Sequence, residues 1–136
     1  MIIDATDGVL GRIAAFAAHQ AKRGEKIEIV NCEKAVITGS REDILSRYFR
    51  KMKMGVSRKG PFLKTRPEML FKKTIRGMLP YKQDKGKAVL ERITCYQGIP
   101  AELKGKPESV KEAHVSKTGS LKYITIQEVC SRLKER

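Results

Sequence analysis

The sequence has no tryptophan, and aromatic residues make up only 6% of its 136 positions. Leu, Ile, Val and Ala must therefore fill the core, and an apolar content of 40% is sufficient for that. No apolar run reaches the roughly 18 residues that a membrane-spanning helix needs, and no basic stretch precedes the strand-like segment IIDA at the start. We therefore expect a soluble, cytoplasmic protein that has no membrane partner.

Cysteines are few and widely spaced. Cys32, Cys95 and Cys130 are odd in number, and the sequence has no C-x-x-C pair. This pattern is typical neither of a disulfide framework nor of a zinc site, so we expect buried thiols in a reducing compartment. His19 and His114 also lack a cysteine or carboxylate at the spacing of a metal site or a catalytic triad. We predict that no metal ion is bound.

Residue patterns for catalysis are also missing. No G-x-S-x-G motif occurs, and Glu42 and Asp43 are adjacent at a helix start, where they cannot face each other across a bond to be cleaved. The turn DGVLGR, from Asp7 to Arg12, follows a strand and opens a helix as in dinucleotide-binding folds, but its G-x-G-x-x-G pattern is incomplete. We predict no catalytic residue, no cofactor and no small-molecule substrate. A nucleotide-dependent enzyme that uses this turn is the enzymatic alternative.

Acidic residues are nearly absent from one region. Residues 47–87 contain 14 Lys and Arg but only Glu68 and Asp84 as acids, which gives this segment a formal charge of +12. The whole chain carries +14, so the remaining residues, 15 basic and 13 acidic, contribute only +2. Charges of one sign repel one another unless a polyanion neutralises them. The sequence therefore predicts a local binding surface for a polyanion.

The length and the order of the elements predict one α/β domain over residues 1–136. Strand-like segments at 2–5, 26–31, 35–38, 93–97 and 122–124 alternate with helical patterns at 9–22, 40–54, 67–76, 87–92 and 125–134. Short strand-helix-strand crossovers place their strands parallel. We expect a layered α/β fold, in which helices cover a sheet with parallel strands, and a basic loop-helix extension at about 47–87. Residues 100–118 are predicted to be an extended surface segment.

Capping residues mark the expected helix ends. Asp7 is predicted to cap the first helix, and Ser40 and Thr125 each begin a capping box in front of a helix. Gly77 is placed to end the helix at 67–76 in the left-handed conformation, and Pro80 prevents that helix from resuming. The segment KKTIRGMLPYK at 72–82 therefore combines a sharp helix end with four basic side chains.

Two amphipathic helices and the loop between them carry the excess charge. The predicted core-facing residues are Ile44, Leu45, Tyr48, Phe49 and Met52 in the helix at 40–54, and Leu70, Phe71, Ile75, Met78 and Leu79 in and after the helix at 67–76. The loop at 55–66 has no periodicity and contains two glycines and a proline, so we expect a long basic loop that is mobile without a partner.

RNA is the polyanion that this pattern favours. Lys and Arg neutralise phosphates, and RNA bases stack on aromatic side chains such as Phe62 and Tyr81. Of the aromatic residues in the region, Tyr48 is expected in the core and Tyr81 is the favoured stacking residue. The predicted RNA-binding residues are Arg47, Arg50, Lys51, Lys53, Arg58, Lys59, Lys64, Arg66, Lys72, Lys73, Arg76, Tyr81 and Lys82.

Three stretches resemble one known family: IIDATDGVLGRIAA at the start, IVNCEKAVITG at 29–39 and KKTIRGMLPYK at 72–82. They are similar to the family of the thirteenth protein of the large ribosomal subunit, in its archaeal and eukaryotic branch, over about residues 1–100. Within them, the stretch from Arg76 to Pro80 resembles the family signature.

The resemblance implies a compact three-layer α/β/α domain with a mostly parallel four-stranded sheet. It further implies that this domain is bound directly to large-subunit ribosomal RNA beside neighbouring large-subunit proteins. It also implies a role early in subunit assembly, a location in the cytoplasmic large ribosomal subunit, and no catalysis. A free RNA chaperone or a translational regulator that leaves the ribosome is the non-enzymatic alternative.

Overall fold

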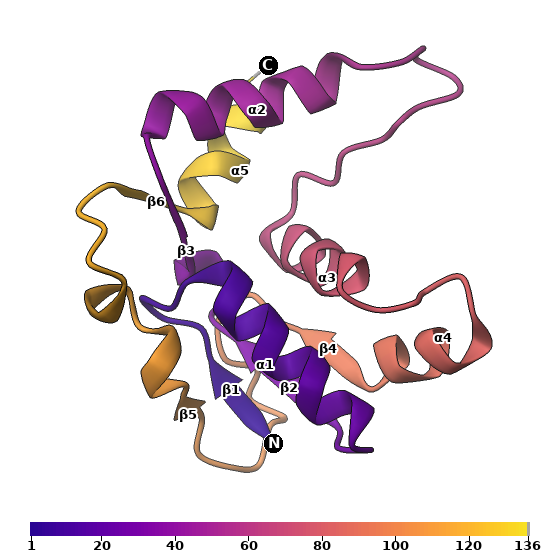
Figure 1. Cartoon of the computed structure of the whole chain (residues 1–136), viewed down its shortest axis with the longest axis vertical. Coiled ribbons are helices and arrows are strands. Elements are labelled where there is room, and N and C mark those ends of the chain that lie inside the picture. Colours follow the sequence, from indigo (N-terminus) through magenta and orange to yellow (C-terminus); the bar gives the residue numbers. More distant parts are fainter. Residues whose placement is uncertain (136) are drawn as a thin grey trace.

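The computed structural model describes residues 1–135 (Figure 1). Its main sheet has the strand order β4-β2-β1-β5, with β1 (Ile2–Asp4), β2 (Ile27–Val30), β4 (Ile93–Cys95) and β5 (Glu108–Ser109). All neighbouring strands run parallel, so that Ile3 pairs with Ile29 and Ile27 with Ile93. The α/β class with a parallel four-stranded sheet is confirmed, and the arrangement is consistent with the predicted three-layer α/β/α fold.

Within residues 1–135 the helices are α1 (Leu10–Lys22), α2 (Arg41–Lys53), α3 (Pro67–Gly77), α4 (Asp84–Glu91) and α5 (Ile126–Lys134). Their number and order agree with the prediction, but α4 begins at Asp84 instead of 87. The acidic side chain of Asp84 favours this start because it lies at the positive end of the helix. Two short 3-10 turns, Lys111–Ala113 and Val115–Thr118, lie within the segment predicted to be extended.

Of the three predicted capping residues, only Thr125 makes the capping hydrogen bond of its helix. The cap of α1 is Val9, not Asp7, because Asp7 lies in the left-handed region with φ 53° and is two residues too early. Ser40 occupies the N-cap position of α2, but its side chain makes no capping hydrogen bond. Thr125 caps α5 as predicted, since its Oγ1 accepts a hydrogen bond of 3.3 Å from the Glu128 amide.

A second, two-stranded antiparallel sheet pairs β3 (Val36–Thr38) with β6 (Tyr123–Thr125). The strands predicted at 35–38 and 122–124 therefore exist, but they lie outside the main sheet. Its fourth strand is β5, which comes from the segment predicted to be an extended surface. The two residues of β5, Glu108 and Ser109, are polar and exposed, so no apolar alternation identified them as a strand.

The main core lies between α1, α3 and one face of the sheet. Four alanines of α1 (Ala14, Ala17, Ala18 and Ala21) are buried, and such small side chains permit close packing of α3 against α1. From α3, the Phe71 ring is completely buried in the same cluster, and from the sheet Ile29 and Ile93 are completely buried there. Truncating a buried Phe costs about 3–5 kcal/mol, so this packing fixes the position of α3.

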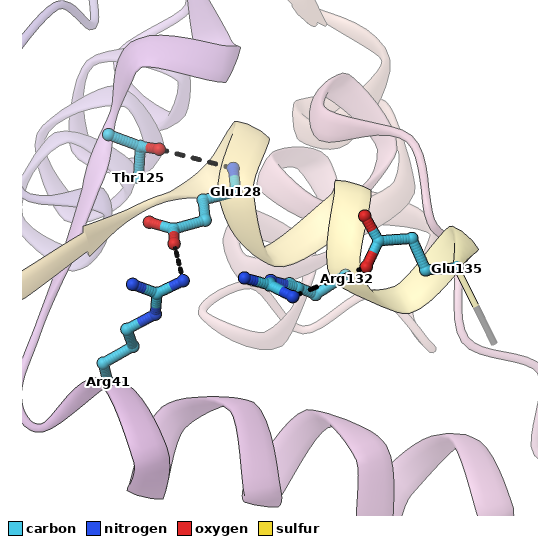
Figure 2. A network of polar contacts seen from close by, with 5 residues as sticks. All are labelled: Arg41, Thr125, Glu128, Arg132 and Glu135. Atoms are coloured by element: carbon cyan, nitrogen blue, oxygen red, sulfur yellow. Dashed lines mark hydrogen bonds and ion pairs between the residues drawn. The ribbon is translucent and has the colours of Figure 1, made fainter.

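A smaller core holds α2 against α5. It contains Ile44 of α2 with Ile124, Val129 and Leu133. Polar contacts strengthen this junction, as Figure 2 shows: Arg41 in the first turn of α2 forms an ion pair with Glu128 of α5, next to the Thr125 cap. At the end of α5, the Arg132 guanidinium lies 3.6 Å from the carboxylate of Glu135, which follows the last helical residue. The start of α2 is therefore attached to the C-terminal helix.

Candidate nucleic-acid interface

Helix α2 separates an apolar face from a basic face as its sequence predicts. Ile44 is buried, and the other predicted core-facing residues are half-buried (Leu45, Tyr48, Phe49 and Met52). The basic side chains are all exposed (Arg47, Arg50, Lys51 and Lys53). Burial raises the pKa of Tyr48, and the Lys51 ammonium lies 5.6 Å from the centre of its ring. Tyr48 is thus a packing residue, which agrees with the prediction.

The loop after α2 contains a tight turn at its far end. The Val56 amide donates to the Gly60 carbonyl at 3.2 Å, and the Gly60 amide donates to the Val56 carbonyl at 2.9 Å. Gly55 has φ 82°, and a Cβ there would lie 1.9 Å from the Gly60 oxygen, so only glycine fits. This turn exposes Arg58 and Lys59, and Figure 1 shows the loop extending away from the sheet before it returns to α3.

Helix α3 begins with Pro67 in its first turn and is held by its buried face. Leu70, Phe71 and Ile75 lie in the main core, as predicted. The opposite face presents Lys73 and Arg76 to solvent, and Lys72 is half-buried. The helix backbone that carries these basic side chains is therefore packed on the main core.

The end of α3 differs from the prediction in two respects. Gly77 is the last helical residue and is not left-handed; the helix closes instead because the Met78 amide bonds to the Ile75 carbonyl at 2.9 Å. Met78, which the sequence pattern assigned to the core, is 40% exposed, and only Leu79 is buried there. A tightened last turn makes a left-handed residue unnecessary.

The chain after α3 is held by a close approach that the sequence does not reveal. A Cβ on Gly86 of α4 would lie 2.1 Å from the Pro80 carbonyl oxygen, so glycine is required for this contact. The turn places the ring of Tyr81 under the Arg76 guanidinium, at 4.2 Å from the ring centre. This cation–π contact holds Arg76 while leaving its side chain exposed.

The predicted basic residues have no acidic partners. In residues 1–135, the ion pairs join Lys26 to Glu28, Arg41 to Glu128, Lys87 to Asp84 and Arg132 to Glu135. None of these pairs includes a predicted RNA-binding residue. Eleven of those twelve Lys and Arg are exposed, and only Lys72 is half-buried. The positive charge of this surface is therefore not neutralised by the protein itself.

The structure brings some of these residues together and leaves others apart. Lys64, Lys72, Lys73 and Arg76 line one open groove of about 390 Å³, and Arg50 and Lys53 line another beside α2. The remaining predicted basic residues lie outside both grooves (Arg47, Lys51, Arg58, Lys59, Arg66 and Lys82). Sequence reasoning missed Met69 and Leu90, which also line the first groove. Met69 could have been found, since it shares a helix face with Lys72, Lys73 and Arg76.

The turn from Asp7 to Arg12 is used for packing. A Cβ on Gly8 would lie 2.3 Å from Cδ1 of Ile13, so this glycine permits close contact between the turn and α1. The Val9 amide, at the start of α1, donates to the Ala113 carbonyl at 2.8 Å. Protein groups therefore occupy part of the position that a phosphate takes in dinucleotide-binding folds.

A carboxylate also lies at this end of the sheet. Burial tends to raise the pKa of Asp4, but hydrogen bonds from the Asn31 side chain at 3.0 Å and from Thr6 lower it overall. Asp4 is therefore ionised at neutral pH, and its charge opposes the binding of a phosphate beside it. Both observations favour a packing role for the turn.

The described residues contain no group of three His, Cys, Asp or Glu side chains that could hold a metal ion. The cysteines are free thiols; Cys32 and Cys130 are buried as expected, whereas Cys95 is half-buried. Burial raises the pKa of Cys130 to about 11, which keeps its thiol protonated at neutral pH. Within residues 1–135, no helix has both the length and the apolar character needed to cross a membrane.

Comparison with known proteins places these features in one family. The family model of ribosomal protein L13 matches residues 1–102. The large ribosomal subunit protein uL13 of Methanosarcina barkeri is 41% identical over 134 residues, which cover 97% of this chain and 96% of that protein. The uL13 proteins of Archaeoglobus fulgidus and Methanopyrus kandleri are 40% and 39% identical, over 94% and 97% of this chain and 83% and 85% of their own lengths. The family resemblance of the sequence is thereby confirmed, and the chain belongs to the ribosomal protein L13 family.

Proposed function

We propose that this protein is a structural constituent of the large ribosomal subunit and binds large-subunit ribosomal RNA through the basic surface of residues 47–82. The observation that carries the proposal is the set of twelve Lys and Arg side chains in this segment that have no ion-pair partner in the described chain. The printed name of its relatives, large ribosomal subunit protein, supports the same assignment.

In this proposal, RNA phosphates replace the missing acidic partners. Each phosphate contact by Lys or Arg releases condensed counterions, and this release drives binding at low salt. The packing of α3 on the main core and of α2 on α5 holds the basic side chains in fixed positions. Residues 1–136 act as one domain that orients charge, contacts neighbouring ribosomal proteins and supports early subunit assembly, and they carry out no reaction.

Sucrose-gradient sedimentation in high salt tests this function. The protein, tagged in its own cells, is expected to remain with the large subunit after a high-salt wash that strips loosely bound factors. Crosslinks from residues 47–82 should then map to large-subunit RNA. Release of the protein to the top of the gradient would favour the free RNA chaperone or regulator instead.

A further inference from the structure

The groove between the basic loop, α3 and α4 is lined in part by apolar side chains. Phe62 is 64% exposed and Met69 is 41% exposed, and both line this groove together with the half-buried Leu90. These side chains lie in the most strongly charged region of the chain. Phosphate contacts alone do not require them, because a phosphate binds to Lys and Arg without an apolar surface.

The other residues that line the same groove are all basic. Lys64 comes from the loop, and Lys72, Lys73 and Arg76 come from α3; no acidic side chain lines the groove. An apolar ligand without charge gains nothing from four cations, and a phosphate gains nothing from the apolar side chains. The chemistry that matches both is an aromatic base attached to phosphates.

Phe62 and Arg76 each lie close to a neighbour within the protein before any ligand binds. The Phe62 ring lies beside Gly60, where a Cβ would be 3.0 Å from ring atom Cδ2, and the hydrogen bonds between Gly60 and Val56 close that turn. The Arg76 guanidinium lies over the Tyr81 ring. A side chain restricted by such a neighbour loses less conformational entropy on binding, which favours an RNA ligand in this groove.

We propose that this groove binds one unpaired nucleotide of large-subunit ribosomal RNA, with its base stacked on Phe62 and its phosphates facing Lys64, Lys72, Lys73 and Arg76. The volume of about 390 Å³ lies within the roughly 300–1,000 Å³ typical of small-ligand pockets. The inference rests on the proposed binding of ribosomal RNA and adds a base-binding subsite to it. This proposal assigns base stacking to Phe62 and not to Tyr81, which the sequence favoured, because the Tyr81 ring already contacts the Arg76 guanidinium.

The absence of tryptophan makes a direct test available. The variant Phe62→Trp places the only indole of the chain in the groove, where stacking of a base is expected to quench its fluorescence. The matched control is Tyr123→Trp, at a half-exposed position of β6 away from the groove. Each variant is titrated with protein-free large-subunit ribosomal RNA until a filter-binding assay shows saturation. We expect strong quenching for Phe62→Trp and little change for Tyr123→Trp.

Affinity measurements complete the test. Phe62→Ala is expected to weaken RNA binding about 5- to 150-fold, the range that corresponds to one lost base-aromatic stack, whereas Phe62→Tyr should retain wild-type affinity. Saturable RNA binding without quenching of Phe62→Trp, and with unchanged affinity of Phe62→Ala, would overturn the subsite while leaving the proposed function intact. Quenching that appears only in assembled subunits, and not with RNA alone, would assign the groove to a protein segment and also overturn it. A complete lack of RNA binding by the wild-type protein would instead reject the proposed function.

Discussion

Two regions, residues 47–87 and residues 96–125, contain long irregular stretches between elements of the core, yet their charges differ. The first has 14 basic and two acidic residues, whereas the second has five Lys and three Glu. Both are largely exposed. Exposure and irregular structure therefore do not distinguish the two regions, whereas their net charge does, and this charge is the basis for proposing a binding surface in the first region.

The second region uses its backbone to complete the fold. It supplies β5 to the main sheet and β6 to the small sheet, and Ala113 and Ile124 enter the two cores. The Glu112 carbonyl accepts a 3.0 Å hydrogen bond from the Arg12 guanidinium of α1. In residues 47–87, by contrast, α2 and α3 pack with one face and present cations without an ion-pair partner on the other. The comparison supports the proposal that the first region binds RNA, and it assigns to the second region a part in completing the sheets and the cores.

The largest effect is expected from charge reversal in the first region. The triple variant Arg50→Glu, Lys73→Glu and Arg76→Glu should lose co-sedimentation with large subunits, with affinity for the RNA reduced roughly 100-fold or more, because three attractive contacts become repulsive. All three side chains are exposed, so the far-ultraviolet circular dichroism spectrum should be unchanged.

A matched control reverses three exposed lysines of the second region. Lys104→Glu, Lys117→Glu and Lys122→Glu change the net charge by the same amount. This variant should still co-sediment and should lose only the affinity that follows from the lower overall charge. Equal losses in both triple variants would contradict the assignment of RNA binding to residues 47–87.

Substitution of a buried residue in the second region is expected to cause a large decrease in the free energy of unfolding. Ile124→Ala removes a completely buried side chain from the small core, and a decrease of about 2–5 kcal/mol in the free energy of unfolding is expected in urea titrations. Leu121→Ala, three residues earlier and 96% exposed, is the control and should change stability by less than about 0.5 kcal/mol. Similar values for the two variants would show that β6 does not pack as described.

A smaller effect is expected at the cap of α5. Thr125→Ala removes the hydroxyl that accepts from the Glu128 amide and should cost about 1 kcal/mol in the same titration. Thr125→Ser retains the hydroxyl and should restore most of this stability. A serine variant as unstable as the alanine variant would point to a packing role of the methyl group instead of capping.

Much of this architecture could be predicted because the relevant signals are local. The apolar period of α3 placed Leu70, Phe71 and Ile75 in the core, and the capping box located the start of α5 at Thr125. The polar strand β5 could not be predicted, since Glu108 and Ser109 pair with β1 only through tertiary structure. Likewise, the separation of β3 and β6 into their own sheet depends on how distant segments meet.

The candidate site was predicted in its charges but not in its shape. The scarcity of acidic residues in this segment identified its basic surface, because the net charge of a segment can be counted from the sequence alone. The groove beside Phe62 could not be predicted, since it requires Met69 and Leu90 to come together from two helices. The conformation of Gly77 at the helix end was predicted wrongly. A glycine followed by a proline does not show whether the helix ends with a tightened last turn or with a residue in the left-handed conformation.

The dependence of RNA affinity on salt tests the central claim most directly. Each phosphate contact contributes about 0.7–0.9 to the slope of log K against log salt concentration. Substituting Arg50, Lys73 and Arg76 by Gln should therefore reduce this slope by roughly 2–3, whereas Gln at Lys104, Lys117 and Lys122 should leave it nearly unchanged. Equal slopes for the wild-type protein and the first variant would contradict the claim that the basic surface of residues 47–82 binds the RNA backbone.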